Sequence, residues 1–136
     1  MAIELPRKAN VIIIGGGVVG CSIAYHLAKL GWSDVLLLER KQLTSGTTWH
    51  AAGLIGQLRA SINMTRLARY TADLYRQLEA ETGQATGYRQ CGSISIATNL
   101  ERFEELKRNA SMAKVFGLPV HVISREEIKQ RYPLIN

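Results

Sequence analysis

Cysteine, proline and aromatic residues are all scarce in this sequence of 136 residues. It contains 2 cysteines and 3 prolines, and aromatic residues make up 7% of it. Cys21 and Cys91 lie far apart without the spacing of metal ligands, so we expect two reduced, largely buried thiols and no metal site. A disulfide-based secreted scaffold is excluded, because such scaffolds are rich in cysteine.

Long hydrophobic runs and a recognisable targeting segment are missing as well. The longest apolar run near the start, Val11 to Ile14, is far shorter than the roughly 20 residues that span a bilayer, so no membrane span is predicted. Met1 to Lys8 has neither the apolar core of a secretory signal nor the amphipathic character of an organelle transit peptide. We therefore expect a cytoplasmic protein.

Charge of one sign is in excess but is not concentrated. The formal net charge is +6, from 17 basic and 11 acidic residues, and the basic residues are dispersed along the chain. No stripe of aromatic and basic residues suggests RNA recognition, so we interpret the excess as solvated helix faces and expect no nucleic-acid partner. With 46% hydrophobic and 21% charged residues, the composition is globular rather than disordered.

The first third of the chain has the pattern of a strand–helix–strand unit, within residues 10 to 40. Val11 to Ile14 is an uninterrupted apolar run, typical of a strand buried on both faces of a parallel sheet. A helix is predicted over Val18 to Leu30, with Gly31 as its stop, and a second strand over Asp34 to Leu38. The predicted fold class is therefore α/β, a Rossmann-like nucleotide-binding fold.

The remaining residues are expected to form only the beginning of the rest of this fold. A loop is expected over about residues 43–58, and residues 59–136 are expected to begin further helices and strands. The predicted elements are helices over Met64 to Thr82 and Leu100 to Phe116, strands over Ser93 to Ala97 and Val120 to Ile123, and a brief helix opened by a capping box at Ser124 to Glu127.

The glycines after the first strand fit the pattern G-x-G-x-x-G. Because they follow a strand and open a helix, the pattern predicts a dinucleotide site. Gly15 allows the tight turn, Gly17 lets the backbone approach a pyrophosphate, and Gly20 lets helix and strand pack closely. Glu39, at the end of the second strand, is placed to accept hydrogen bonds from ribose hydroxyls and would repel the 2′-phosphate of NADP.

The next loop is unusual for a mere connection. Ser45 to Gly53 reads Ser-Gly-Thr-Thr-Trp-His-Ala-Ala-Gly, in which small and hydroxyl residues suit a backbone that passes close to a large cofactor. Together with Asn10 to Gly20, Glu39-Arg40, and Leu43 to Arg59, it resembles the N-terminal flavin domain of the dimethylglycine and sarcosine dehydrogenases, members of the D-amino-acid-oxidase-like superfamily. Gln90 to Ile94 and Arg131 to Leu134 also resemble later segments of that family.

The resemblance implies FAD as the cofactor and assigns roles to this loop. In the family, the histidine of the Trp-His-Ala pattern is linked covalently to the flavin 8α-methyl group, which here implies His50. A neutral imidazole is a good nucleophile, whereas the residues alone would also fit a loop histidine bonded to a backbone carbonyl. Trp49 is expected beside the flavin ring or in the core. The further cofactor-binding candidates are Arg40, Ser45, Thr47, Thr48 and Gly53.

The resemblance also implies the reaction. The family oxidises secondary or tertiary N-methyl amines such as sarcosine or dimethylglycine, with the flavin as hydride acceptor. Folate would bind only through sequence that is absent here, and the catalytic residues are not identified. We expect an inactive partial domain whose exposed apolar strand flanks need the rest of a polypeptide or another subunit.

Two other readings stay open at this point. One is a non-catalytic relative of the same architecture, similar to the regulatory subunit of pyruvate dehydrogenase phosphatase; the intact Trp-His-Ala-Ala-Gly run favours the enzyme. The other is an NAD-binding dehydrogenase domain, which leaves residues 44–56 unexplained. A yellow protein whose colour survives acid precipitation would separate these readings.

Overall fold

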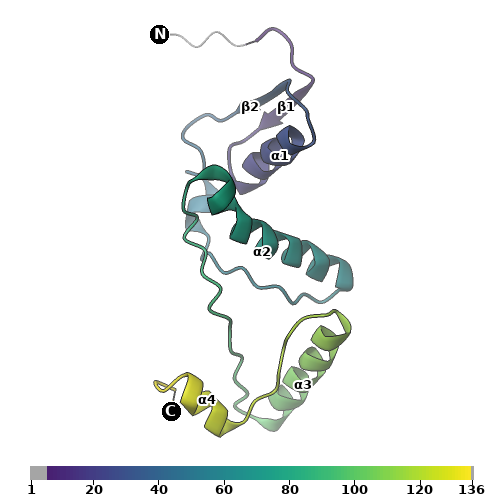
Figure 1. Ribbon diagram of the computed structural model, residues 1–136, viewed down its shortest axis with the longest axis vertical. Helices are drawn as coiled ribbons and strands as arrows, with labels where there is room; N and C mark the ends of the chain where they lie inside the picture. Colours follow the sequence, from purple (N-terminus) through teal and green to yellow (C-terminus); the bar gives the residue numbers. More distant parts are fainter. Residues whose placement is uncertain (1–5, 136) are drawn as a thin grey trace. The chain divides into compact units, whose positions relative to one another are not determined.

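The computed structural model describes residues 6–135, so part of the predicted absence of a targeting signal at Met1 to Lys8 lies outside the described residues. The chain divides into two units, Met1–Leu54 and Ile55–Asn136. Among the described residues, the first unit contains two strands and an α-helix, and the second contains three α-helices. Figure 1 shows these elements along the chain.

The first unit is built on a parallel strand pair joined by a helix. β1 (Val11–Ile14) pairs in parallel with β2 (Val35–Leu38), so that Val11 lies opposite Val35 and Ile14 opposite Leu38. The connecting helix α1 (Val18–Lys29) contacts both strands (Figure 1). This arrangement confirms the strand–helix–strand unit expected over residues 10–40, because a parallel pair requires a crossover connection.

The ends of α1 follow from local backbone chemistry. Gly17 is its N-cap and has extended backbone angles. Because glycine has no side chain, the cap residue itself cannot accept hydrogen bonds from the first N–H groups of the helix. The helix ends at Lys29, and Gly31 has a φ of +87°, a conformation that glycine adopts without strain. The predicted stop at Gly31 is therefore confirmed.

One face of β1 is open in the described residues. Only Ile13 is buried, at 7% exposure, whereas Ile12 and Ile14 are 57% and 87% exposed. The apolar run is of the kind that a larger sheet buries on both faces, and its exposure here agrees with the open strand flanks expected of a partial domain. The sheet there has two strands, and α1 alone cannot cover both faces of it.

The second unit contains three capped helices. These are α2 (Ile62–Thr82), α3 (Leu100–Val115) and α4 (Arg125–Arg131). The predicted capping box at the start of α4 is confirmed, since the Ser124 hydroxyl accepts from Glu127 N and the Glu127 carboxylate accepts from Ser124 N. Gly83 ends α2 with a φ of +72°, as expected for a left-handed C-terminal residue.

The two later strands predicted from the sequence are wrong. Residues 93–97 and 120–123 are irregular in the structure, although their residue types favour strands. A strand is defined by hydrogen bonds to a neighbour, and across residues 6–135 only β1 and β2 supply each other with such a partner. Propensity alone therefore does not make these segments strands.

Charged groups and cysteines lie mostly at the surface. Basic residues of α2 and α3 form exposed ion pairs one turn away on the same helix, in agreement with solvated helix faces. Both cysteines are free thiols, but Cys91 is exposed and Cys21 only half-buried, so the expected burial is wrong. No helix within residues 6–135 is both long and apolar enough to cross a membrane.

Candidate functional site

The glycine turn between β1 and α1 is shaped by close backbone contacts. Gly15 has a φ of +103°, and its N–H donates to the Leu38 carbonyl at 2.8 Å, which extends the strand pairing by one residue. A Cβ atom added to the buried Gly20 would lie 1.9 Å from the Gly15 carbonyl oxygen. Only glycine at position 20 therefore lets the first turn of α1 approach the strand this closely.

Glu39 lies directly after β2 and reaches back to this turn. Its Oε2 accepts from Gly16 N at 2.8 Å, and its Oε1 accepts from Lys41 N at 2.9 Å. The hydrogen bond from Gly16, followed by that from Lys41, lowers the pKa of the Glu39 carboxyl below its ordinary value, and the charge of Arg40 adds to this effect. Glu39 is therefore ionised at neutral pH, and each oxygen keeps a lone pair for a ligand hydroxyl.

The loop after β2 is attached to the glycine turn at two points. Thr44 N donates to the Gly16 carbonyl at 2.8 Å, and Val18 N donates to the Thr48 hydroxyl at 2.9 Å. Between these contacts the chain forms the 3₁₀ helix η1 (Thr47–His50). The loop and the turn are thus linked through one donor and one acceptor of the turn.

Two residues of this loop were missed by the sequence reasoning. Thr44 has a φ of +65°, which is rare for a β-branched residue, and no local sequence pattern predicts this left-handed conformation. Leu43 packs on Gly16, where an added Cβ would lie 2.5 Å from Leu43 Cδ2. A long apolar side chain directly before a run of small polar residues is the one signal that could have pointed to Leu43.

The loop and the turn line an open cavity of about 520 Å³, within the usual size range of small-molecule sites. Its wall combines the start of α1, the end of β2 with its cationic neighbours, and the loop around η1. The lining residues are Gly17, Val18, Val19, Glu39, Arg40, Lys41, Ser45, Gly46, Thr47, Thr48 and Ala51.

Most of the cofactor-binding candidates from the sequence meet at this cavity. Six of them line it, namely Gly17, Glu39, Arg40, Ser45, Thr47 and Thr48. Gly15 and Gly20 shape the turn behind it. His50 and Gly53 do not line the cavity, although His50 ends η1 immediately before the lining residue Ala51.

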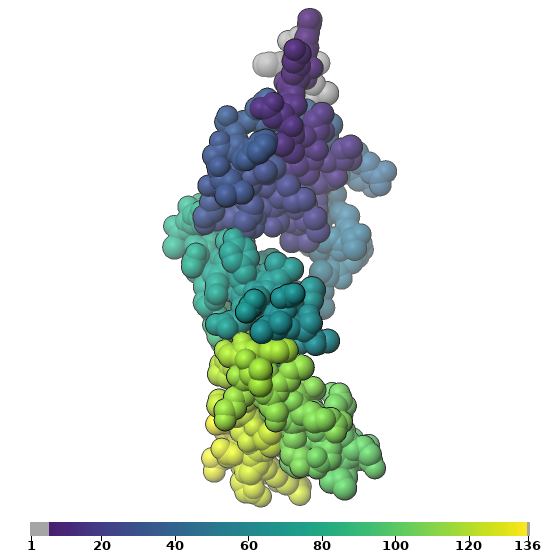
Figure 2. All heavy atoms as spheres, turned by 90° about the vertical axis from the view of Figure 1, so that its right-hand side faces the viewer, coloured from purple at the N-terminus to yellow at the C-terminus, as the bar shows by residue number. Residues whose placement is uncertain are grey.

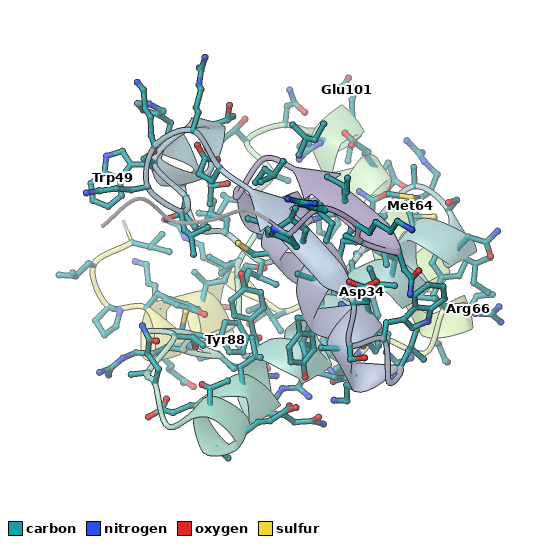
Figure 3. All side chains as sticks on the ribbon, turned by 90° about the horizontal axis from the view of Figure 1, so that it is seen from above. Asp34, Trp49, Met64, Arg66, Tyr88 and Glu101 are labelled. Atoms are coloured by element: carbon teal, nitrogen blue, oxygen red, sulfur yellow. The ribbon has the colours of Figure 1, made fainter. Side chains whose placement is uncertain are left out.

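The side chains at the outer end of the loop are open to solvent. Trp49 is 79% exposed and points away from β1, β2 and α1 (Figure 3), so it is not a core residue among those described. His50 is exposed as well. In the space-filling view, the blue loop after β2 stands out at the edge of the first unit (Figure 2). This end of the loop is therefore free to contact a ligand larger than the cavity.

The donors and acceptors of the cavity suit a nucleotide that carries a diphosphate. The N-terminus of α1 presents N–H groups and the positive end of a helix dipole, which favour an anion. Arg40 and Lys41 add positive charge, while the Glu39 carboxylate provides acceptors for ribose hydroxyls. The residues present therefore fit the ADP part of FAD. Within residues 6–135, no group of three or more His, Cys, Asp or Glu side chains could hold a metal ion.

Comparison with known proteins gives a family match over nearly the whole chain. The family described as FAD-dependent oxidoreductase (DAO) matches residues 10–136. The chain is 52% identical to human mitochondrial sarcosine dehydrogenase over 133 residues, 97% of this chain and 14% of that protein. It is 45% identical to rat mitochondrial dimethylglycine dehydrogenase, over 98% of this chain and 16% of the relative.

Two further proteins are similar to nearly the whole of this chain. The mouse pyruvate dehydrogenase phosphatase regulatory subunit is 44% identical, over 99% of this chain and 15% of that protein. The crystal structure of L-proline dehydrogenase from P. horikoshii superimposes with a TM-score of 0.87 at 31% identity, covering 97% of this chain and 34% of the other. The chain thus spans about a seventh of the length of these curated relatives.

Proposed function

The chain belongs to the family of FAD-dependent oxidoreductases, and from this premise we propose that it provides the FAD-binding part of an enzyme that oxidises an N-methyl amine. The observation that carries the proposal is the cavity of about 520 Å³ between the glycine turn and the loop after β2. Its lining matches the ADP half of the cofactor in charge and in hydrogen-bonding groups. When bound, FAD would supply the hydride acceptor.

In this proposal each element of the first unit has one task. The N-terminus of α1 binds the diphosphate, and Glu39 accepts hydrogen bonds from the ribose. Arg40 offsets the negative charge of the phosphates, and Ser45 and Thr47 line the path toward the flavin, whereas the hydroxyl of Thr48 is used by the protein itself, in the hydrogen bond from Val18 N. The exposed residues at the end of η1 are left to meet the isoalloxazine ring.

We further propose that His50 carries the flavin through its 8α position. The support is its place at the end of η1, beside the cavity and open to solvent, together with the resemblance of the Trp-His-Ala-Ala-Gly run. A bond between an imidazole nitrogen and the 8α carbon would replace one C–H bond of the 8α-methyl group and the N–H bond of the imidazole. The two electrons and two protons released in this step would be taken up by the flavin itself, so the attachment would leave a reduced flavin and would need no other oxidant.

The substrate is proposed to be sarcosine, dimethylglycine or a similar N-methyl amine. Two relatives that are 52% and 45% identical to this chain are named sarcosine dehydrogenase and dimethylglycine dehydrogenase, which supports this class. Because the chain spans 14–16% of these relatives, we propose that further polypeptide or another subunit supplies the substrate-binding residues. The non-catalytic alternative is not favoured, because the Trp-His-Ala-Ala-Gly run of residues 49–53 is intact; identity alone does not separate the two, since the regulatory subunit is 44% identical and dimethylglycine dehydrogenase 45%.

The cell compartment is a separate proposal. Cytoplasmic location remains a prediction, and the sarcosine and dimethylglycine dehydrogenases are named as mitochondrial proteins. Fractionation of the source cells followed by detection of the protein would decide between these locations.

The proposed activity is tested by following the flavin absorbance of the protein that carries this sequence. Under anaerobic conditions, sarcosine or dimethylglycine should bleach the absorbance near 450 nm, about where oxidised flavins absorb. The matched amine without an N-methyl group, glycine, should not bleach it. A colourless protein that binds NAD would contradict the proposal.

The covalent link is tested by mass spectrometry and acid precipitation. In the wild-type protein, the peptide containing His50 should carry the mass of the flavin, and the colour should stay with the precipitate. His50→Ala should make the flavin extractable while the thermal unfolding temperature stays close to that of wild type, because His50 is exposed. The control His121→Ala, at an exposed position in the second unit, should keep its flavin. An unmodified His50 peptide in the wild-type protein would refute the link.

A further inference from the structure

The N-terminus of α1 is capped by a residue from outside the helix. The N-cap Gly17 has no side chain, and the Val18 N–H donates instead to the hydroxyl of Thr48, 30 positions later, at 2.9 Å. Gly17 leaves room for this contact, since a Cβ added there would lie 3.1 Å from Thr48 Oγ1. One N–H group of the proposed phosphate-binding turn is therefore already used by the protein itself.

The same threonine belongs to η1, which ends at His50. Ala51 N donates to the Thr48 carbonyl at 3.2 Å, and Trp49 N donates to the carbonyls of Thr44 and Gly46 at 3.1 and 3.2 Å. Because Thr44 is itself bonded to Gly16, the loop is held against the glycine turn on both sides of residues 45–47. The position of His50 is thus set by contacts to the turn that is proposed to bind the diphosphate.

We propose that Thr48 is a positioning residue for attachment of the flavin at His50. Its hydroxyl fixes η1 on the glycine turn. When the diphosphate of FAD is bound at that turn, the 8α-methyl group of the flavin and the imidazole of His50 are therefore held at a defined distance from each other. This inference rests on the proposed function, and it differs from a direct role of Thr48 in holding the cofactor. Orientation of reacting groups contributes to rate without adding contacts to the ligand.

The acceptor of this contact is removed by Thr48→Val, which keeps the shape of the side chain. Variants of the full polypeptide that carries this sequence, produced without flavin, are mixed with FAD, and covalent incorporation is followed by flavin fluorescence in denaturing gels. The rate should fall by about three- to thirtyfold, the range expected for a lost helix cap. Thr48→Ser should restore most of it, because the serine hydroxyl can accept the same hydrogen bond.

Noncovalent affinity separates positioning from direct binding. In a His50→Ala background, Thr48→Val should change the dissociation constant for FAD by less than about twofold, because the freed Val18 N–H is available to the phosphate. A matched control is Thr86→Val, in which a loop threonine of the second unit also loses a hydroxyl that accepts a backbone N–H, that of Tyr88. This control should incorporate flavin at the wild-type rate.

The possible outcomes distinguish the inference from the proposal beneath it. Wild-type protein without flavin on His50 would overturn the proposed covalent link, and the inference with it. A wild-type rate in Thr48→Val, if His50 is modified, would overturn the inference alone. A parallel loss of rate and of noncovalent affinity would also overturn it and would make Thr48 a ligand contact. Slow incorporation at unchanged affinity, restored by serine, supports the inference.

Discussion

Glu39 combines a structural and a proposed binding role at the scale of single residues. Its two carboxylate oxygens accept from Gly16 and Lys41, so the side chain links the end of β2 to the glycine turn, next to the hydrogen bond from Gly15 N to the Leu38 carbonyl. The same charge faces the cavity. The position of Glu39 after the second strand was enough to predict a hydrogen-bond acceptor for ribose. The hydrogen bond from Gly16 N to Glu39 depends instead on how the glycine turn and the end of β2 lie in the tertiary structure.

Replacing Glu39 by glutamine tests this double role. In Glu39→Gln one carboxylate oxygen becomes an amide NH₂ group, which cannot accept from a backbone N–H or from a ribose hydroxyl. We expect noncovalent FAD binding, measured by titration in a His50→Ala background, to weaken about tenfold or more. The control Glu101→Gln, on an exposed helix of the second unit, should leave the affinity unchanged. Equal affinities for the two variants would remove Glu39 from the ribose site.

The lowered pKa of Glu39 gives this contribution a defined pH dependence. A carboxyl with a folded-state pKa below its unfolded value stabilises the folded state at pH values above the unfolded pKa, which is about 4.3 for glutamate. This stabilisation is lost as the pH falls through the folded-state pKa. The difference in unfolding temperature between wild type and Glu39→Gln should therefore be constant near neutral pH and shrink in acid. A difference that grows in acid would contradict the assignment.

At the scale of elements, the C-terminal ends of α1 and α2 and the start of α4 were predictable, whereas α2 begins at Ile62, two residues before the predicted Met64, and only the first two of the predicted strands are paired. The stops at Gly31 and Gly83 and the capping box at Ser124 depend on residues within one turn of the helix end, so the sequence contains all the necessary information. The segments 93–97 and 120–123 have suitable residues for strands but no hydrogen-bonded neighbour within residues 6–135. A strand depends on a partner that its own residues do not specify.

The packing of α1 on the glycine turn is tested by two alanine substitutions. Gly20→Ala places a Cβ 1.9 Å from a backbone oxygen that cannot move without distorting the turn, so we expect destabilisation of about 1–3 kcal/mol or more. Gly56→Ala is the control, because its φ is not positive and its added Cβ meets only the flexible end of Arg59, at 3.4 Å. Its effect should stay within about 0.5 kcal/mol. Chemical unfolding of both variants measures the difference, and equal stabilities would contradict the close contact.

At the scale of the whole molecule, the described residues bury little apolar surface. In the first unit Ile13 is buried, whereas Ile12 and Ile14 next to it remain exposed. In the second unit the buried apolar residues are Ala72, Ala113 and Leu118. Exposed apolar groups of this kind favour association with further protein surface.

The exposed strand flanks predict the behaviour of the 136-residue chain by itself. Because its apolar surface is open, it should bind the hydrophobic probe ANS and self-associate in light scattering. As a partial domain, it should not reduce an electron-accepting dye when an N-methyl amine is added. Ile14→Thr should lower ANS binding with little change in stability, because Ile14 is 87% exposed. Ile13→Thr, at a buried position on the same strand, should instead destabilise the unit. A monodisperse monomer that reduces dye with sarcosine would contradict this prediction.

The sequence by itself determined the strand–helix–strand unit, the glycine turn, the acid at residue 39 and the helix ends, because each depends on residues close together in the chain. Only the tertiary structure decided that Thr44 and Thr48 bond to the turn from 28 and 30 positions away, and that Glu39 is held by Gly16. Contacts of this kind depend on the path of a loop through space. That path results from the packing of Leu43 and the left-handed backbone at Thr44, neither of which follows from a local sequence pattern.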